Sequence, residues 1–307
     1  MQIFTSLEDI RIEDKTALAL GNFDGIHIGH TEILKYALEA AKSKGLKSMC
    51  YTFSNHPFNF IMHRNASDPE GIKLICSEAD KIEMLEEMGF DYLVNVPFDE
   101  VTMKMHAHDF FEDILVKTLN VAVISVGFNY TYGTRAEGKA EDLLIEGETN
   151  GIEVHVHDAV MYGNNVVSST LIREMIASGD MVLAEELLGR PYSFAGVVEH
   201  GKAIGREKGF PTVNILPEAD RALPPFGVYA GITSIEGREY KCIVNIGNQP
   251  TFNGTATRIE SHLFDYSGNA YDKDIIVRLK KFIRPEMKFS SSEELYEQIK
   301  KDCEAVL

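Results

Sequence analysis

The stretch from residue 17 to residue 44 constrains the fold of this chain more than any other part of the sequence. Residues 17–20 are apolar and have the character of a buried strand, and a glycine-containing turn follows them. From Thr31 to Lys44, apolar residues recur at helical spacing. A strand that turns tightly into a helix places backbone N–H groups and the positive end of the helix at the tip of a parallel sheet, so this stretch predicts a phosphate site.

Two histidines lie within the turn. His27 and His30 are three residues apart, and Gly29 between them allows the backbone to approach a ligand closely. Imidazole groups in this position could donate hydrogen bonds to a phosphate whose negative charge grows during a reaction. The chain contains no G-x-G and no G-K-[ST], which excludes the dinucleotide fingerprint and the P-loop as the source of this site.

The turn as a whole has a more specific pattern. The segment H-x-G-H is similar to the nucleotidyltransferase superfamily of adenylyl- and cytidylyltransferases, and the full G-N-F-D-G-I-H-I-G-H of residues 21–30 resembles the bacterial bifunctional riboflavin kinase/FAD synthetase family. The resemblance implies an α/β nucleotidyltransferase domain, Rossmann-like with a parallel sheet, followed by a small antiparallel β-barrel with a C-terminal helix. It implies that the nucleotide contacts Gly21, Asn22, Phe23, Asp24, His27, Gly29 and His30, with Asn22 beside the reacting phosphates.

The pattern of the first half agrees with a parallel sheet. Short apolar runs alternate with amphipathic segments, which is typical of βαβ units. The expected strands are 17–20, 47–53, 91–96, 121–126 and 152–157, and the expected helices are 31–44, 77–88, 107–118, 138–150, 170–177 and a short one near 180–188. Ligands in such sheets bind beyond the carboxyl ends of the strands, where the motifs of this half lie.

The residue pattern changes in the second half, which predicts a second domain. Glycines become frequent after residue 189, and short β-rich runs separated by turns predict a small antiparallel barrel or sandwich with a final helix from Ser290–Glu294. We expect domains at 1–186 and 187–307. The expected strands are 193–199, 227–235, 240–247, 258–266 and 274–282.

Two further motifs of the first half resemble the same family. Residues 126–133, which contain Asn129, are similar to a segment that lines the flavin and nucleotide site. Residues 167–173 read as a second helix N-terminus with hydroxyl groups and an arginine, a combination that could bind a triphosphate. The resemblance implies that Ser168, Thr170 and Arg173, with Ser169 beside them, hold the leaving pyrophosphate during adenylyl transfer from ATP.

The second half resembles the riboflavin kinase part of the family more densely. Residues 201–214 predict a loop that folds over phosphates, with Gly201, Lys202, Gly205, Arg206, Gly209 and Pro211 binding the nucleotide. The oxygens of Thr212 and Asn214 suit Mg²⁺. The resemblance implies that Asn245 binds the ligand. It also implies that Glu260, within E-S-H-L-F-D, is the base for the 5′-hydroxyl of riboflavin.

Other histidines carry weaker signals. The family usually has T-F-x-P-H-P after the second strand, whereas this chain keeps His56 and Pro57 and places Asn55 before them. His106-x-His108 and His155-x-His157 have the spacing of metal pairs. We expect neither to bind a metal, because the first pair lies at an expected helix start, and the second lies on one strand face with no Cys or further His near it in sequence.

The net charge and the cysteines limit which partners and which cellular compartment we expect. With 30 basic and 47 acidic residues, the net charge of −17 disfavours nucleic acid and anionic membranes as partners. The four cysteines are far apart, no apolar run reaches the length of a membrane span, and no signal core follows the N-terminus. We therefore expect a cytoplasmic protein that binds no nucleic acid and no membrane.

These observations lead to one functional hypothesis and three alternatives. The resemblance implies that the C-terminal domain phosphorylates riboflavin to FMN with MgATP, releasing ADP, and that the N-terminal domain converts FMN and ATP to FAD and pyrophosphate. The alternatives are a paralogue with only one active domain, a flavin-binding regulator without catalysis, and a nucleotidyltransferase with a different phosphate acceptor, which would leave the second half unexplained. Asn55 and the loosely matching segment 134–138 are departures from the family pattern in the half to which the resemblance assigns adenylyl transfer.

Overall fold

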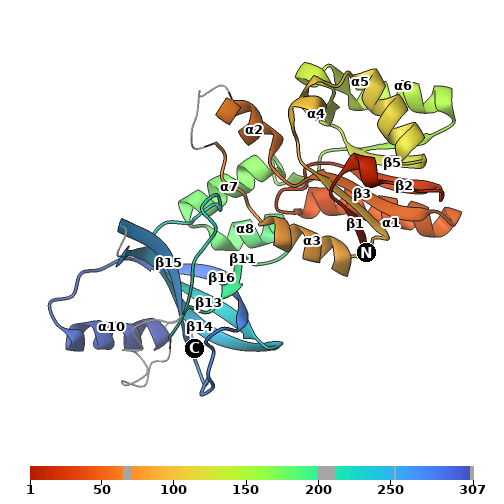
Figure 1. The fold of residues 1–307 in the computed structure, drawn as a ribbon. Coiled ribbons are helices and arrows are strands. Elements are labelled where there is room, and N and C mark those ends of the chain that lie inside the picture. The colour runs from red at the N-terminus through yellow and green to blue at the C-terminus, as the bar shows by residue number, and fades with distance from the viewer. Residues whose placement is uncertain (65–70, 200–211, 252–253, 305–307) are drawn as a thin grey trace. The chain divides into compact units, whose positions relative to one another are not determined.

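The computed structural model describes residues 1–64, 71–199, 212–251 and 254–304, and the chain divides into two compact units (Figure 1). The first unit is Met1–Ser169 and the second is Thr170–Leu307. Each unit has its own sheet and is described by itself. The expected domain boundary between residues 186 and 187 stays a prediction.

The first unit is built on a six-stranded sheet in which every pairing is parallel. Its order is β1-β4-β3-β2-β5-β8, so the chain moves outward from β2 on one side through β3 and β4, and then returns to add β5 on the other side. The reversal makes the carboxyl ends of β2 and β5 a topological switch point. The strands are β1 (Gln2–Phe4), β2 (Thr16–Leu20), β3 (Lys47–Phe53), β4 (Tyr92–Val96), β5 (Val121–Gly127) and β8 (Glu153–His157).

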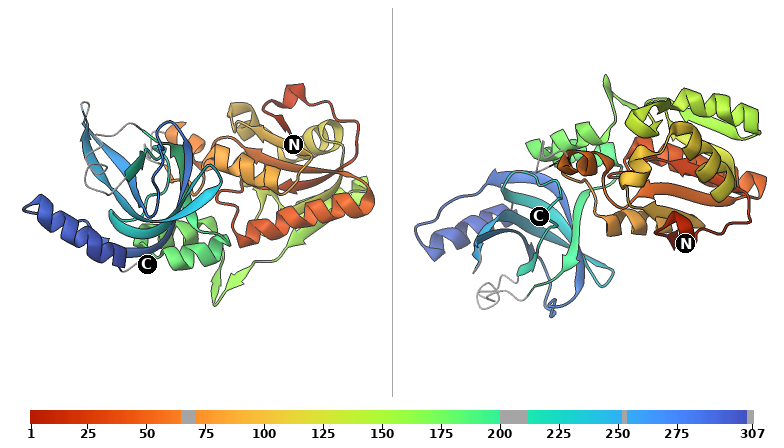
Figure 2. Two further views of the ribbon diagram at one scale, coloured as in Figure 1. Left: turned by 90° about the horizontal axis from the view of Figure 1, so that it is seen from below. Right: turned by 45° about the horizontal axis from the view of Figure 1, so that its top comes forward.

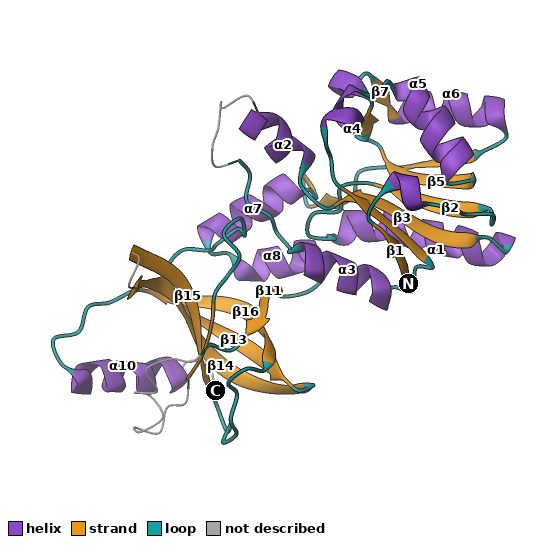
Figure 3. Cartoon of the chain, viewed as in Figure 1, coloured by secondary structure: helices purple, strands orange, loops and turns teal. Residues whose placement is uncertain are grey.

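Helices cover both faces of this sheet (Figure 3). Helices α1 and α3 lie on one face, and α4, α5, the π-helical segment η2 and α6 lie on the other. The bounds are α1 (Ile28–Lys44), α2 (Pro57–Arg64), α3 (Glu78–Glu87), α4 (Glu100–Lys104), α5 (Ala107–Asp109), η2 (Phe110–Thr118) and α6 (Ala140–Asn150). The short elements are η1 (Leu7–Asp9), β6 (Thr131–Tyr132), η3 (Thr134–Ala136), β7 (Gly138–Lys139), β9 (Met161–Tyr162) and β10 (Asn165–Val166).

Strand β2 shows why its sequence is an unbroken apolar run. All five of its residues are buried, because helices pack on both faces. Leu18 and Leu20 belong to the core that contains Phe111 and Leu115 of η2. Ala19, pointing to the other face, belongs to the core that contains Leu34 of α1. The small side chains on that face let α1 approach the sheet closely.

The second unit is an antiparallel sheet of order β11-β16-β13-β14-β15-β12 that curls toward closure (Figure 2). At its two edges, the Glu199 N–H donates to the Asn214 carbonyl oxygen at 2.9 Å. A Cβ added to Gly196 would lie 3.2 Å from that of Ile215, so a glycine permits this approach. The strands are β11 (Tyr192–Val197), β12 (Thr212–Ile215), β13 (Gly227–Ile235), β14 (Arg238–Thr251), β15 (Gly254–Leu263) and β16 (Asp274–Pro285).

Among the described residues after Val167, three segments are helical. Helix α7 (Ser169–Ser178) and helix α8 (Met181–Leu188) precede the barrel strands, and α10 (Ser292–Glu304) follows them. Asp180 starts α8 by accepting a hydrogen bond from the N–H of Leu183 at 3.0 Å. Helix α10 is held by Asp302, whose carboxylate accepts three hydrogen bonds from Arg284 at 2.7–3.1 Å.

The predicted fold class is confirmed, and three of the details that differ from the expectations have a clear physical reason. Residues 212–215 form strand β12 and are not part of a loop, because they pair in register with β15. Strand β1 was missed since it is a three-residue edge strand with two exposed residues. Helix α2 was not among the expected helices, although proline, here Pro57, suits the first position of a helix.

Among the described residues, no helix combines the length and the apolar character needed to cross a bilayer.

The ion pair that holds α10 gives the first prediction. The side chains of Arg284 and Asp302 are 15% and 4% exposed, so replacing Asp302 with alanine leaves a largely buried cation without its carboxylate. We expect Asp302→Ala to destabilise the docked helix by about 3 kcal/mol, seen as amide hydrogen exchange in α10 that is on the order of 100-fold faster. As a control, Glu236→Gln breaks the exposed pair with Lys273 and should lower the free energy of unfolding by less than about 1 kcal/mol. Equal effects of the two variants would contradict this reasoning.

Candidate active sites

The turn that the sequence singled out lies at the switch point of the parallel sheet. It leaves β2 after Leu20, which is paired with Val126 of β5, and it enters α1 at Ile28. Helix α1 begins three residues earlier than expected, so His27 is its N-cap and His30 lies in its first turn. The backbone N–H groups of this turn are thus at the carboxyl end of the sheet, where a phosphate is favoured.

The two histidines of the turn are stacked on each other. Their ring centroids are 3.6 Å apart with an interplanar angle of 15°, and the rings of Phe23 and His30 form a T-shaped pair with a centroid separation of 5.4 Å. His27 is only 5% exposed. Its Nδ1 accepts a hydrogen bond from the backbone N–H of His30 at 3.1 Å, so a neutral His27 carries its proton on Nε2. The cap therefore fixes which nitrogen can donate to a ligand.

The backbone of the turn is strained. Phe23 and Ile26 have φ angles of 51° and 37°, a region that non-glycine residues rarely adopt, and Gly25 has a φ of 84°. A Cβ added to Gly21 would lie 2.8 Å from the fully buried Phe23 ring. Strain of this kind persists only where the surroundings hold it, and it concentrates at functional sites.

Asp24 supplies much of that support. Its carboxylate is buried and accepts hydrogen bonds from the N–H groups of Ile75 at 2.9 Å and Cys76 at 3.4 Å. Its backbone carbonyl accepts a hydrogen bond from the Ser169 hydroxyl at 2.9 Å. Asp24 thereby joins the turn to the start of α3 and to Ser169, and its role as a ligand contact stays a prediction.

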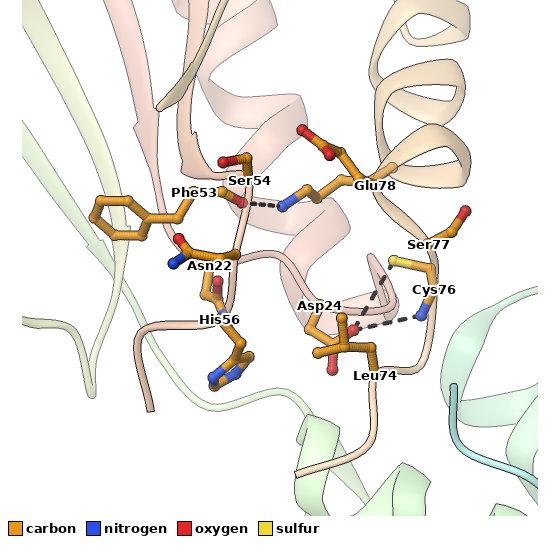
Figure 4. A pocket seen from close by; sticks show the side chains of 11 residues that line it. Asn22, Asp24, Phe53, Ser54, His56, Leu74, Cys76, Ser77 and Glu78 are labelled. Atoms are coloured by element: carbon orange, nitrogen blue, oxygen red, sulfur yellow. Dashed lines mark hydrogen bonds between the residues drawn. The ribbon is translucent and has the colours of Figure 1, made fainter. Parts of the chain in front are cut away.

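A small cavity that opens to solvent lies beside the turn (Figure 4). Three segments surround it: the turn after β2, the segment after β3, and the residues that lead into α3. The side chains of Asn22, Asp24 and His56 border it, as Figure 4 shows. The full lining is Asn22, Asp24, Phe53, Ser54, Asn55, His56, Leu74, Cys76, Ser77, Glu78 and Lys81.

Lys81 lines this cavity and was missed in the sequence. It is 7% exposed, and its ammonium group donates to the carbonyl oxygen of Phe53 at 2.6 Å and to the hydroxyl of Thr52 at 3.3 Å. Burial lowers the pKa of Lys81, while negative charges, including those of Asp24 and Glu78, oppose that shift. The available signal was its position in α3, one turn before Leu85 on the apolar face of the helix.

Asn55 and His56 make local hydrogen bonds that explain why an amide and an imidazole occur at these positions. The side-chain amide of Asn55 donates to the carbonyl oxygen of Phe98 at 3.0 Å and accepts from its N–H at 2.6 Å, which joins the segments after β3 and β4. His56 Nδ1 accepts from the N–H of Phe58 at 3.2 Å in the first turn of α2. Asn55, which departs from the family pattern, therefore stabilises the contact between these two segments.

The residues predicted from the motifs at 126–133 and 167–173 lie in two places. Asn129 is exposed and follows β5 at the switch point, next to Tyr130, whose ring stacks on Tyr132. Ser168 and Ser169 close the first unit, whereas Thr170 and Arg173 belong to α7 in the second. Their joint contact with a ligand stays a prediction.

The histidine pairs have other partners. His106 and His108 are exposed and pair with Glu137 and Glu146. His155 stacks on Tyr36, with 4.1 Å between ring centroids. No group of three or more metal-ligating side chains with suitable geometry occurs among residues 1–64, 71–199, 212–251 and 254–304.

The barrel brings the predicted kinase residues into one row. Glu260 of β15 is in register with Asn214 of β12 on one side and with Asn245 of β14 on the other. Register partners point to the same face of a sheet, so these three side chains are neighbours. Thr212, two residues from Asn214 along β12, shares that face. All four are half-buried, whereas Val213 and Ser261 on the opposite face are buried in the core.

This row offers a carboxylate and neutral oxygens together. One carboxylate, two amides and one hydroxyl match the hard oxygen ligands that Mg²⁺ prefers, and a carboxylate next to them can accept a proton. The other predicted nucleotide contacts, Gly201, Lys202, Gly205, Arg206, Gly209 and Pro211, lie outside the described residues.

Two family models match the chain. One described as FAD synthetase matches residues 9–171, and one described as riboflavin kinase matches residues 188–307. Residues 172–187, which include most of α7 and α8, lie between the two matches.

Similar proteins extend over nearly the whole chain. A protein of Haemophilus influenzae named bifunctional riboflavin kinase/FMN adenylyltransferase is 35% identical, over 99% of this chain and 97% of its own length. A protein of Bacillus subtilis with the same name is 36% identical, over 94% of this chain and 90% of its own. A Streptococcus pneumoniae crystal structure titled a macrolide-efflux protein has a TM-score of 0.85 at 31% identity, over 99% of this chain and 97% of that chain.

The cap at His27 gives the second prediction. His27→Ala removes the acceptor for the His30 N–H and should destabilise the first turn of α1 by about 1 kcal/mol, whereas His27→Asn retains an acceptor that suits an N-cap. Hydrogen exchange of the α1 amides measures this, and we expect exchange about fivefold faster in the alanine variant only. Equal exchange rates in the two variants would show that the hydrogen bond to the His30 N–H does not stabilise the first turn of α1.

His157 gives a pH prediction. Its Nε2 lies 2.9 Å from the Ser125 hydroxyl, which itself donates to the Ile33 carbonyl oxygen, so His157 donates to Ser125. Burial, followed by the charge of His155, lowers the pKa of His157 below 6.5, against smaller effects of Glu32 and Asp158. The unfolded chain binds the proton more readily, so stability should rise with pH between the lowered pKa and about 6.5. An NMR titration of the ring measures the midpoint, and a value above 6.5 would contradict the assignment.

Proposed function

The chain belongs to the family of bifunctional riboflavin kinases/FMN adenylyltransferases, and from this membership we propose how its two units divide the work. The chain phosphorylates riboflavin to FMN and adenylates FMN to FAD, with ATP as the co-substrate of both reactions. The first unit contains most of the FAD synthetase match, and the second contains the riboflavin kinase match. The roles assigned to residues of the first unit depend on one observation: at the switch point, His27 stacks on His30 and caps α1 by accepting a hydrogen bond from the His30 N–H.

In the first unit, adenylyl transfer needs positioned groups and no protein nucleophile. A phosphate oxygen of FMN attacks the α-phosphorus of ATP, the bond to the bridging oxygen breaks, and pyrophosphate leaves. Negative charge shifts onto the leaving group, and donors fixed in advance stabilise it. We assign this role to the Nε2–H of His27, to His30 and to the N–H groups of the turn. Ser168 would hold the pyrophosphate, with Asn22 beside the reacting phosphates.

In the second unit, the row of Glu260, Asn214 and Asn245 provides the phosphoryl-transfer chemistry. Glu260 would accept the proton of the riboflavin 5′-hydroxyl as that oxygen bonds to the γ-phosphorus of ATP and ADP departs. Thr212 and Asn214 would hold Mg²⁺, which neutralises phosphate charge when bound. Their hydroxyl and amide oxygens fit this ion, and they flank the carboxylate that receives the proton.

The proposed compartment is the cytoplasm. All four cysteines, Cys50, Cys76, Cys242 and Cys303, are free thiols. This agrees with a reducing environment.

The assignment of two separate sites predicts separable losses. Glu260→Gln should lower FMN formation from riboflavin by on the order of 100-fold or more, because the amide cannot accept the proton. FAD formation from supplied FMN should change less than about twofold in this variant, since the glutamate lies in the other unit. Products are separated by chromatography after incubation with ATP and Mg²⁺.

A second variant should give the reverse pattern. His27→Asn keeps the helix cap and removes the imidazole, so FAD formation should fall by on the order of 100-fold while FMN formation persists. Wild-type protein that makes FMN but no FAD would support a paralogue with one active domain. Flavin binding without either product would support a regulator. Loss of both activities in either variant would contradict two independent sites.

A further inference from the structure

We propose that Lys81 and Thr52 are positioning residues that hold Asn22 in place for adenylyl transfer, an inference that rests on the proposed function of the first unit. The two side chains form a chain of hydrogen bonds that ends on the backbone of the turn. The Lys81 ammonium group donates to the Thr52 hydroxyl at 3.3 Å, and that hydroxyl donates to the Asn22 carbonyl oxygen at 3.0 Å. The same ammonium group donates to the Phe53 carbonyl oxygen at 2.6 Å.

This chain joins three elements at the carboxyl edge of the sheet. Thr52 and Phe53 end β3, Asn22 follows β2, and Lys81 lies in the first half of α3. Thr52 is fully buried and Lys81 is nearly so. A hydrogen bond made away from water is costly to break, because the donor or acceptor left behind has no replacement partner. The position of the Asn22 peptide is therefore tied to two other elements.

Asn22 needs such support because of its neighbours. It lies between Gly21, which has no side chain to restrict the backbone, and Phe23, whose φ of 51° is unfavourable for a residue with a Cβ. The Asn22 side chain borders the cavity (Figure 4). A small rotation of the peptide would move that side chain relative to the reacting phosphates. Misplacement of a contacting group by about 1 Å can reduce a rate by about 100-fold.

Direct binding of a phosphate by Lys81 is less consistent with the charges around the cavity. Its lining contains two carboxylates, Asp24 and Glu78, besides the single ammonium group of Lys81. Glu78 is held there by a hydrogen bond from Asn95 at 2.6 Å. The Lys81 ammonium group already has two protein acceptors at the end of β3. The structure thus assigns Lys81 to orienting protein groups, and it is not the anchor of an anion.

A double-mutant cycle on the full-length protein tests this role. Lys81→Met and Thr52→Val are each made in the wild-type background and in an Asn22→Ala background, and kcat and KM are measured for FAD formation from FMN and ATP. We expect each variant to lower kcat at least tenfold in the wild-type background, with KM values changed less than threefold. In the Asn22→Ala background the same changes should lower kcat less than twofold, because the group they position is absent.

Matched variants separate positioning from general destabilisation. Thr52→Ser keeps a hydroxyl and should restore most of the kcat lost in Thr52→Val. Thr16 is also fully buried and donates to a backbone carbonyl oxygen, that of Leu119, but it lies at the amino end of β2. Thr16→Val should therefore leave FAD formation within twofold. Amide hydrogen exchange in β2 and β3, measured on the same samples, reports whether the first unit is folded.

Each result has one meaning. Equal losses in the wild-type and Asn22→Ala backgrounds, or a loss in Thr16→Val as large as in Thr52→Val, would overturn the proposal. An increase in the KM for FMN with an unchanged kcat would show that Lys81 binds substrate instead. Full activity of Asn22→Ala would remove Asn22 from the reaction and the proposal with it. Failure of the wild-type protein to form FAD would refute the proposed function itself, which is a distinguishable outcome.

Discussion

The first unit depends on how the chain leaves strand β2. Seven residues separate the end of this buried strand from the start of α1, and two of them, Phe23 and Ile26, have unfavourable positive φ angles. The strain is balanced by contacts that come from elsewhere in the sequence. Asp24 binds the segment before α3, Thr52 binds the Asn22 carbonyl oxygen, and the His27 ring caps α1. The parallel sheet supplies the fixed frame for these contacts, because it places the ends of β2, β3 and β5 side by side.

In the second unit, the register of the strands alone brings the proposed reacting groups together. Its proposed reacting groups lie on three adjacent strands, and the antiparallel pairing aligns Asn214, Glu260 and Asn245. A shift of one residue in any strand would turn that strand's side chain to the opposite face. Buried partners on the other face, such as Val213 and Ser261, make such a shift costly because they would become exposed. Core packing therefore protects the geometry of the polar row.

The sequence predicted most of the architecture, and the parts it missed have identifiable causes. Residues 47–53 and 227–235 were predicted as strands with the observed bounds, since their apolar patterns are long and flanked by turn residues. Thr212–Ile215 was read as a loop because its role as an edge strand depends on pairing with β15, which lies far away in sequence. Lys81 escaped notice for a related reason. A lysine in an amphipathic helix is ordinarily solvated, and only the fold shows that its ammonium group is buried against β3.

The hydrogen bond from Ser169 to the Asp24 carbonyl oxygen bears on how the protein can be cut into working pieces. Ser169 is the last residue of the first unit and the first residue of α7. A fragment truncated before it would lose an anchor of the strained turn as well as the start of that helix. A fragment that continues through Ser178 would keep both. The compact-unit boundary is thus a poor place to divide this polypeptide, and the natural place for a scission lies beyond α7.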